Sequence, residues 1–187
     1  MKTLYFITGN KGKFVEVKEK FKSLSITLVQ NDLGYPEIQA DTLEEVAQFG
    51  IETLQKRCSE SFILEDAGLF IDTLKGFPGV YSKYVFYTIG LDGILRLLHD
   101  KKKSQRTAVF RSVFALKEPK KPVVFFIGEC CGHIATKTKG NNGFGYDPIF
   151  VPERKTQTFA EMTIEEKNQI SHRGKAIEQL ITYLEKK

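Results

Sequence analysis

Two long β-rich segments near the middle of the chain constrain its fold most strongly. They cover Thr107–Leu116 and Val123–Ile134, and the connection between them, Lys117–Pro122, holds three lysines and two prolines. Two strand-type segments separated by a short polar connection are typical of an antiparallel hairpin. The middle of the chain is therefore predicted to form a long hairpin within a sheet.

The N-terminal third has a different pattern, in which short apolar runs alternate with helix-type spacing. The expected strands are Leu4–Thr8, Ile26–Val29 and Phe62–Leu64, and the expected helices are Lys11–Leu24 and one that starts at the capping box Thr42–Glu45. Strand–helix units followed by a long hairpin predict an α/β fold with a mixed sheet.

The remaining segments predict helices and one loop. Tyr81–Leu98 has helical spacing that is interrupted near Gly90–Gly93, and Gly140–Gly145 is too rich in glycine for regular structure. A second capping box stands at Thr163–Glu166. A final helix is expected from about Ser171, which is a suitable N-cap residue.

Composition narrows the class of protein. With 187 residues, of which 41% are hydrophobic, the chain suits one globular domain. Its first apolar run is too short for a signal peptide or a membrane span, so we expect a cytoplasmic protein without a membrane partner. Three cysteines, two of them adjacent, indicate neither a disulfide framework nor a zinc site.

The net charge of +5 fits either a solvated, lysine-rich surface or a polyanionic ligand such as a nucleotide phosphate tail. Neither an arginine-rich arm nor an RNA-binding aromatic motif is present, so no stable nucleic-acid partner is expected. Thr8–Lys13 lies where the first strand turns into the first helix. Its glycines and the helix N-terminus favour phosphate, although the same pattern also fits an ordinary turn.

Acidic residues form a second candidate cluster. Glu65 and Asp66 follow the apolar run Phe62–Leu64, at the expected strand end, and Glu37 lies in an extended segment before a helix. Carboxylate oxygens suit Mg²⁺, which often bridges protein carboxylates and substrate phosphates. Plain surface charges at a strand end are the alternative explanation.

A glycine-rich aromatic loop, Gly143–Pro148, is the third candidate. Phe144 or Tyr146 could stack on a flat ring, and Asp147 could accept a hydrogen bond from a base N–H group. Alternatively, these aromatic side chains could fill the core. The fourth candidate is the set of donors Lys167, His172 and Arg173 beside the start of the last helix, where cations oppose the helix dipole.

These clusters, in this order, resemble the Ham1-like family of inosine triphosphate pyrophosphatases, and the short archaeal members most of all. The resemblance covers nearly the whole chain and is carried by seven collinear segments, which are Thr8–Lys13, Glu65–Gly68, Gly76–Lys83, Gly143–Pro148, Phe159–Met162, Glu166–Asn168 and Ser171–Arg173.

The resemblance implies a fold and a reaction. The fold is a long, twisted mixed sheet flanked by helices, in one domain over residues 1–187 with two lobes around a deep cleft, in a homodimer. The reaction is the Mg²⁺-dependent hydrolysis of ITP, dITP or XTP to the monophosphate and pyrophosphate, which removes these nucleotides before they enter DNA or RNA.

The resemblance also implies site residues. Glu37 and Asp66 would hold magnesium, and Asp66 would be the catalytic proton acceptor, with Glu65 as an alternative. The substrate would contact Thr8, Gly9, Asn10, Lys11, Gly12, Lys13, Ala67, Lys83, Phe144, Gly145, Tyr146, Asp147, Lys167, His172 and Arg173. Of these, Arg173 and Lys167 are obligate donors and would favour bases with a 6-keto acceptor over adenine.

Two positions depart from the family pattern. Many members carry a substrate-contacting lysine in the helix where this chain reads Ala47–Ile51, and many have Ser or Thr at the position of Ala67. Three other functions remain open at this stage. The chain could be a pyrophosphatase for ordinary nucleotides, a non-catalytic nucleotide- or RNA-binding module, or a structural subunit.

Overall fold

The computed structural model describes residues 3–22, 24–36 and 38–186 of the chain. Their strands form one mixed sheet of seven, in the order β2-β1-β3-β5-β6-β7, with β4 paired to β3. The strands are β1 (Thr3–Ile7), β2 (Thr27–Asn31), β3 (Phe62–Ile71), β4 (Pro78–Gly79), β5 (Thr107–Lys117), β6 (Val124–Ile134) and β7 (Phe150–Pro152). The helices are α1 (Lys11–Phe21), α2 (Leu43–Leu54), α3 (Ser82–Thr88), α4 (Gly90–Leu97), α5 (Ile164–Ile170) and α6 (His172–Glu185). The predicted α/β class and mixed sheet are confirmed.

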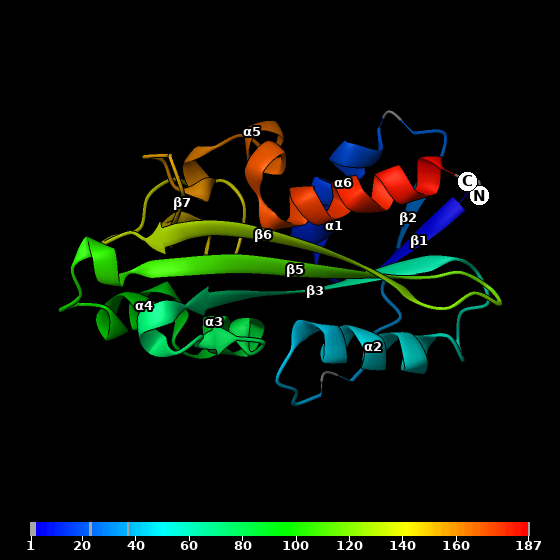
Figure 1. Ribbon diagram of the computed structural model, residues 1–187, viewed down its shortest axis with the longest axis horizontal. Coiled ribbons are helices and arrows are strands. Elements are labelled where there is room, and N and C mark those ends of the chain that lie inside the picture. The colour runs from blue at the N-terminus through cyan, green and yellow to red at the C-terminus, as the bar shows by residue number, and fades with distance from the viewer. Residues whose placement is uncertain (1–2, 23, 37, 187) are drawn as a thin grey trace.

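The long hairpin is also confirmed. β5 and β6 pair antiparallel from Thr107 opposite His133 to Leu116 opposite Val124, and β3 pairs antiparallel with β5 along all ten of its residues. Figure 1 shows these three strands running along the longest axis of the molecule. They form the long centre of the sheet, and the helices are arranged around it.

The N-terminal strand–helix units form as predicted, with small shifts at their ends. β1 lies between β2 and β3 and is parallel to both. Each of its five residues pairs with β2, which fixes β2 at Thr27–Asn31 and not at the predicted Ile26–Val29. α1 ends at Phe21, earlier than the predicted Leu24.

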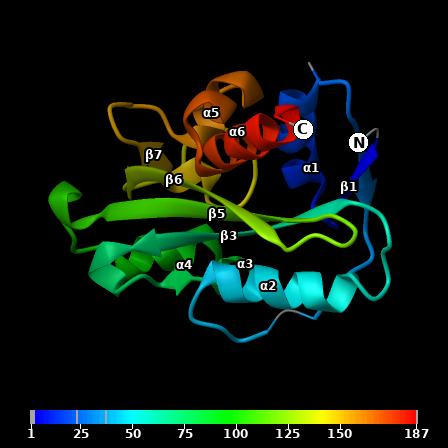
Figure 2. The ribbon, with the colours of Figure 1, turned by 45° about the vertical axis from the view of Figure 1, so that its right-hand side comes forward.

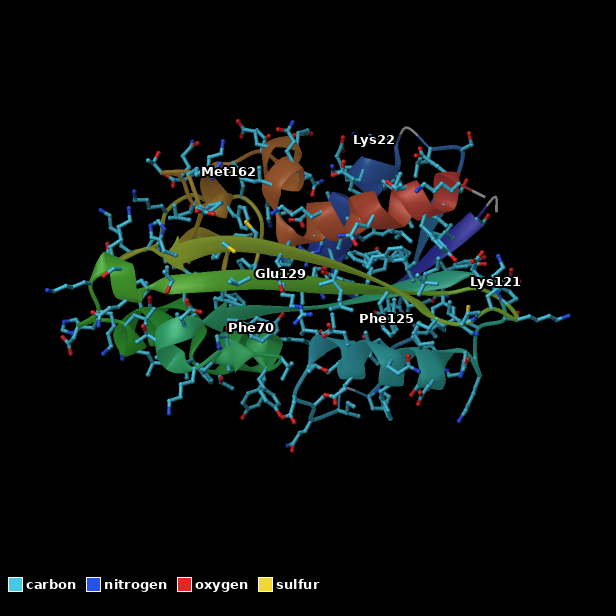
Figure 3. All side chains as sticks on the ribbon, viewed as in Figure 1. Lys22, Phe70, Lys121, Phe125, Glu129 and Met162 are labelled. Atoms are coloured by element: carbon cyan, nitrogen blue, oxygen red, sulfur yellow. The ribbon has the colours of Figure 1, made fainter. Side chains whose placement is uncertain are left out.

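Helices cover both faces of the sheet. α1, α5 and α6 lie on one face and α2, α3 and α4 on the other, as Figures 1 and 2 show from two directions. α6 packs on β5 and β6, and α2 packs on β3 and β5. Figure 3 shows Phe125 on the α2 side of the sheet and Met162 among the segments of the opposite side.

Three clusters of buried apolar side chains form the core. The cluster under α1 and α6 contains Leu4, Phe6, Val17, Phe21, Ile63, Phe114, Leu116, Phe126, Ala176, Ile177, Leu180 and Leu184. The cluster under α2 contains Ile7, Leu43, Ala47, Ile51, Leu54, Phe62, Leu64, Val113 and Ala115. The third joins α3 and α4 to the region of β7 and includes Leu69, Val85, Ile94, Leu98, Phe110, Tyr146, Phe150, Phe159 and Met162.

Most predicted helix boundaries are correct. Thr42 and Thr163 form capping boxes, and the Ser171 hydroxyl accepts from the Gly174 N–H at the start of α6. The predicted interruption of the Tyr81–Leu98 helix falls at Ile89, between α3 and α4. In the described part of the chain, no helix is long and apolar enough to cross a membrane. The division into two lobes stays a prediction.

Candidate active site

A cavity of about 1030 Å³ brings together segments that are far apart in the chain. It is lined by the turn after β1, by the middle of β3, by the start of α3, by the loop before β7 and by the start of α6. Fifteen residues predicted to be functional line it, namely Thr8, Gly9, Asn10, Lys11, Gly12, Lys13, Asp66, Ala67, Lys83, Phe144, Gly145, Tyr146, Asp147, His172 and Arg173. Glu37 lies outside the described residues, and Lys167 is not among the residues of the lining.

An unpaired stretch on one edge of β3 opens the sheet at this cavity. β1 pairs with β3 only at Phe62 and Ile63, and β4 pairs with it only at Leu69 and Phe70. Among the described residues, 64–68 therefore have no strand partner on this edge. The stretch contains Glu65, Asp66 and Ala67, all of which line the cavity.

The backbone of Ala67 faces this opening. In an antiparallel pair, the N–H and C=O groups of every second residue point to the same edge. The Leu69 N–H donates to the Ser82 hydroxyl across the open edge, at 2.8 Å, and the Glu65 carbonyl accepts from Lys13 Nζ there, at 3.2 Å. Ala67 lies between these two residues in the same alternation, so its N–H and C=O are directed to the cavity.

The predicted end of the third strand is wrong. β3 continues from Phe62 to Ile71, because the residues after Leu64 pair with β5. Glu65 and Asp66 thus lie in mid-strand and not at a strand end. Neighbouring side chains of a strand point to opposite faces of the sheet, and the cavity reaches both of these residues at the open edge.

The turn Thr8–Lys13 is held by local contacts and by contacts to β2 and β3. The Asn10 side chain accepts from the Lys13 N–H at 3.0 Å and so caps α1, and the Asn10 N–H donates to the Thr8 hydroxyl at 3.1 Å. A side chain at Gly9 would come within 2.8 Å of the Asp32 carboxylate. Lys13 Nζ reaches back to the Glu65 carboxylate at 3.1 Å. The turn therefore presents a helix N-terminus, polar side chains and a partly buried cation to the cavity.

A chain of alternating buried charges runs from this turn to the other side of the cavity. Lys13 contacts Glu65, whose Oε1 accepts from Nε of Arg173 at 3.0 Å and contacts Nη2 at 2.9 Å. Nη1 of Arg173 donates to Oε2 of Glu16 at 2.7 Å. Oε1 of Glu16 then accepts from Lys167 Nζ, at 2.7 Å, and Lys167 also donates to Asp147 at 2.5 Å. The chain holds three cations and three carboxylates, so its formal charges balance.

These contacts shift the pKa values of the buried carboxyls in different directions. Burial alone would raise the pKa of Glu65, but the charges of Arg173 and Lys13 outweigh it and lower that pKa to about 2. The same competition, with Arg173 and Lys167, lowers the pKa of Glu16. For Asp147 burial prevails over Lys167 and the pKa is raised. Glu65 is therefore a permanent anion and a poor proton acceptor at neutral pH.

Lys167 is held among buried carboxylates next to the cavity. Its ammonium group is almost fully buried between Glu16 and Asp147, and it lies over the rings of Phe144 and Phe159. Asp147, which lines the cavity, accepts both from Lys167 and from the Phe144 N–H, at 2.8 Å. Lys167 thus supports Asp147 from behind, and direct contact with a base stays an untested prediction.

His172 presents a neutral ring. Burial, followed by the charges of Arg173 and Lys167, lowers its pKa well below the usual value. The ring stacks on Phe110, with centroids 4.5 Å apart and planes at 9°. Its Nδ1 is buried without a hydrogen-bond partner in the described part of the chain. A neutral imidazole nitrogen can donate or accept, so this atom is suited to a ligand.

The two aromatic residues of the loop before β7 have different surroundings. Tyr146 is buried, and its hydroxyl donates to the Ser82 carbonyl at 2.9 Å. Phe144 is half-buried, and its ring lies 5.3 Å from the guanidinium carbon of Arg173. It also packs on Gly12, where an added Cβ would come within 2.5 Å of the ring. Phe144 is therefore the better candidate for stacking, whereas Tyr146 fills the core.

Glu16 and Ser112 were missed by sequence reasoning. Ser112 donates to Glu65 at 2.7 Å from β5, and Glu16 joins Arg173 to Lys167 from the middle of α1. An acidic residue on a lysine-rich helix gives no signal of burial. In α2, Ala47–Ile51 is the segment in which many family members carry a substrate-contacting lysine. Gly50 of this segment packs against the Tyr35 ring, where a Cβ would come within 2.9 Å, and Tyr35 lines the cavity.

The donors of the cavity fit a magnesium ion that substrate phosphates help to hold. Asp66 supplies a carboxylate beside the phosphate-type turn, and Asp32 also lines the cavity. Over residues 3–22, 24–36 and 38–186, no group of three or more His, Cys, Asp or Glu side chains could bind a metal alone. Mg²⁺ is commonly held by one or two carboxylates together with substrate phosphates. The residues therefore fit a metal that arrives with its substrate.

Comparison with known proteins gives relatives in a single family. The Ham1 family matches residues 4–183. Proteins of Thermococcus kodakarensis and Pyrococcus horikoshii, both named dITP/XTP pyrophosphatase, are each 50% identical over 181 residues, which is 97% of this chain and 96% of theirs. The structure of a HAM1 protein from Coxiella burnetii superposes with a TM-score of 0.86, at 32% identity and over 100% of both chains. The chain belongs to the Ham1 family.

Proposed function

We propose that this protein hydrolyses non-canonical purine nucleoside triphosphates, namely ITP, dITP and XTP, to the monophosphate and pyrophosphate. The observation that carries the proposal is that one cavity brings three kinds of contact together. The cavity joins the Thr8–Lys13 turn, which suits phosphate, the carboxylate of Asp66, and the side chains of Phe144, Asp147 and Arg173, which suit a base. The names of the archaeal relatives support dITP and XTP as substrates. The activity would remove these nucleotides from the pool used for DNA and RNA synthesis.

The chain's own residues would bind the phosphates and move a proton. Thr8–Lys13 would hold the triphosphate through backbone N–H groups and Lys13, and Lys83 would add a second cation from α3. Asp66, together with Glu37, would hold Mg²⁺, which supplies charge neutralisation of the phosphates when it is bound. The N–H of Ala67 points to the cavity and would position the substrate without a hydroxyl group.

Asp66 would accept the proton of the attacking water. Oxygen of that water would form a bond to the α-phosphorus while the bond to the bridging oxygen breaks, and pyrophosphate would leave with that oxygen. Glu65 is the poorer candidate for the proton acceptor, because Lys13 and Arg173 hold its pKa at about 2. Most of the remaining rate enhancement would come from positioning and fixed charges.

Base selectivity would follow from fixed donors. Nε, Nη1 and Nη2 of Arg173 each contact a carboxylate. Since Nη1 and Nη2 each carry two N–H groups, a second N–H on each can serve a ligand. These donors suit the 6-keto oxygen of hypoxanthine or xanthine and leave the 6-amino group of adenine badly paired, at about 1–3 kcal/mol per unsatisfied buried group.

The test is the release of pyrophosphate from ITP, XTP, GTP and ATP, each with Mg²⁺ and with a chelator. Fast, metal-dependent release from ITP and XTP supports the proposal. Similar release from all four would indicate a general nucleotide pyrophosphatase. No release from any of them by folded protein would contradict the enzyme and favour a binding module.

A variant tests the role of Asp66. The substitution Asp66→Asn keeps the shape of the side chain and removes its charge, so we expect kcat to fall at least about 100-fold at saturating Mg²⁺. Glu65→Gln is the matched control one residue away and should retain kcat within a few-fold. Near-full turnover of Asp66→Asn would remove Asp66 from the chemistry.

We further propose a homodimer that forms through α3, and a location in the cytoplasm, where its substrates arise. Phe77, Tyr81, Tyr84 and Ile89 are exposed large apolar residues that line a groove of about 570 Å³. Clustered exposed apolar residues often mark an interface. Light scattering should find a dimer that Ile89→Glu dissociates. Leu97→Glu, at an equally exposed position outside the groove, should not. A monomeric wild-type protein would contradict the dimer.

A further inference from the structure

Glu65 is the only described carboxylate that contacts a cation of the phosphate-type turn and a cation of the base-side cluster at once. Its Oε2 contacts Lys13 Nζ at 3.1 Å, and its backbone carbonyl accepts from the same ammonium group at 3.2 Å. Its Oε1 accepts from Arg173 Nε at 3.0 Å and contacts Nη2 at 2.9 Å. A third donor, the Ser112 hydroxyl, reaches Oε1 at 2.7 Å. The two cations therefore share one anion.

The environment of Glu65 makes this sharing rigid. Its side chain is fully buried, as is nearly all of Arg173, whereas Lys13 keeps 18% of its side chain exposed. Glu65 stands in the middle of β3, which pairs with β5 along its whole length. Lys13 comes from the first turn of α1 and Arg173 from the first turn of α6. A fixed strand thus sets the distance between two cations carried by different helices.

We propose that Glu65 is a positioning residue that couples recognition of the phosphate tail to recognition of the base. It fixes Lys13 and Arg173 in the orientations in which both line the cavity. This inference rests on the proposed function, because it assigns phosphate to the Lys13 side and base to the Arg173 side. Without the anion, two like charges would be left near each other in a buried site, and each would move toward water or another partner.

The coupling distinguishes Glu65 from its neighbour Asp66. Asp66 lies on the opposite side of the strand and would act on the attacking water, so its loss should lower kcat. The Glu65 carboxylate is engaged by three residues, Lys13, Arg173 and Ser112, and would not touch the reacting atoms. Its loss should weaken binding at both parts of the site and leave kcat much less affected.

The test uses probes for each part of the site. Inorganic triphosphate reports on the phosphate side and inosine on the base side, each titrated into the protein by calorimetry and as an inhibitor of ITP hydrolysis. Reference variants are Lys13→Ala, expected to weaken triphosphate alone, and Arg173→Lys, expected to weaken inosine alone. We expect Glu65→Gln to weaken both probes, each by about tenfold or more, since one partner of two buried charge pairs is lost.

Two outcomes of Glu65→Gln would overturn the proposal. One is that only one probe, or neither, binds more weakly. The other is that kcat collapses while both dissociation constants stay unchanged, which would place Glu65 in the chemistry. A smaller folded fraction would lower kcat and the calorimetric binding stoichiometry together without changing either dissociation constant, so a loss of folded protein is told apart both from positioning and from a role in the chemistry. Failure of wild-type protein to hydrolyse ITP would refute the proposed function, whereas the calorimetric binding data would still report on Glu65.

Milder variants keep the proposal testable if Glu65→Gln does not fold. Ser112→Ala removes one donor to Oε1 and leaves both ion pairs in place, and Glu65→Asp keeps the charge on a shorter side chain. Both should weaken triphosphate and inosine together by a smaller factor, about two- to fivefold. Weakening of one probe alone in these variants would contradict the coupling.

Discussion

The two sides of the cavity are built in different ways. The Thr8–Lys13 turn has hydrogen bonds between residues two or three positions apart, at exposed sites, and it also contacts Gln30 and Glu65, which are 22 and 52 positions from their partners. On the base side, the contacts of Glu16 with Lys167 and Arg173 join residues that are 151 and 157 positions apart, at sites nearly closed to water. The first side thus combines a local motif with contacts to β2 and β3, whereas the second depends on contacts between segments near the two ends of the chain.

The difference predicts that removing a buried acidic residue lowers the free energy of unfolding more than removing an acidic residue on the surface. Glu16→Ala leaves the charges of Lys167 and Arg173 without one partner each, so we expect the free energy of unfolding to fall by about 3–5 kcal/mol. Glu19→Ala on the same helix is the matched control, because its pairing with Lys22 is on the surface and should contribute only about 0–1 kcal/mol. Denaturant unfolding of both variants gives the comparison. Equal losses would mean that the buried chain contributes little to stability.

Low pH should reduce the stability that the buried charges of the base side contribute. The pKa of Glu65 is about 2 in the folded protein, below its ordinary value of 4.5. A depressed folded pKa stabilises the fold above about pH 4.5, and this contribution is lost as the pH falls toward 2. Asp147, whose pKa is raised, acts in the opposite direction. We expect the free energy of unfolding of wild type to fall by a few kcal/mol more over this range than that of Glu65→Gln. Identical pH curves would contradict the depressed pKa.

The local side should respond to loss of its cap. Asn10→Ala removes the side chain that accepts from the Lys13 N–H, so we expect a loss of about 1 kcal/mol, independent of pH between 4 and 8. The measurement is denaturant unfolding at several pH values. Affinity for inosine should not change, since the base side does not depend on this cap. A weakened inosine site would show that the two sides are less separate than their contacts indicate.

Gly12 is where the two sides touch, and its substitution should affect binding more than stability. Alanine favours a helix over glycine by about 1 kcal/mol, but a Cβ here would come within 2.5 Å of the Phe144 ring. We expect Gly12→Ala to raise KM for ITP several-fold, with a free energy of unfolding within about 1 kcal/mol of wild type. Lys18→Ala, at an exposed position of α1 outside the cavity lining, serves as the control for a substitution to alanine in this helix. Unchanged KM in Gly12→Ala would mean that Phe144 moves without consequence.

The same contrast explains what could be predicted from the sequence. The hairpin, the two capping boxes, the Ser171 cap and the turn after β1 depend on neighbouring residues, and each was found. The length of β3 was missed because strand pairing with β5 continues through Glu65–Gly68, where the apolar run is interrupted. Glu16 was missed, and the burial of Lys167 between two carboxylates was not foreseen, because an ion pair across more than 150 positions leaves no local pattern.

The most direct measurement is KM for ITP and for ATP in wild type and in Arg173→Lys, which keeps a positive charge but loses the planar donors of the guanidinium group. If the base side reads the 6-keto group, KM for ITP should rise about tenfold or more, whereas KM for ATP should hardly change. An equal rise for both nucleotides would remove Arg173 from base recognition and contradict the division of the cavity into a phosphate side and a base side.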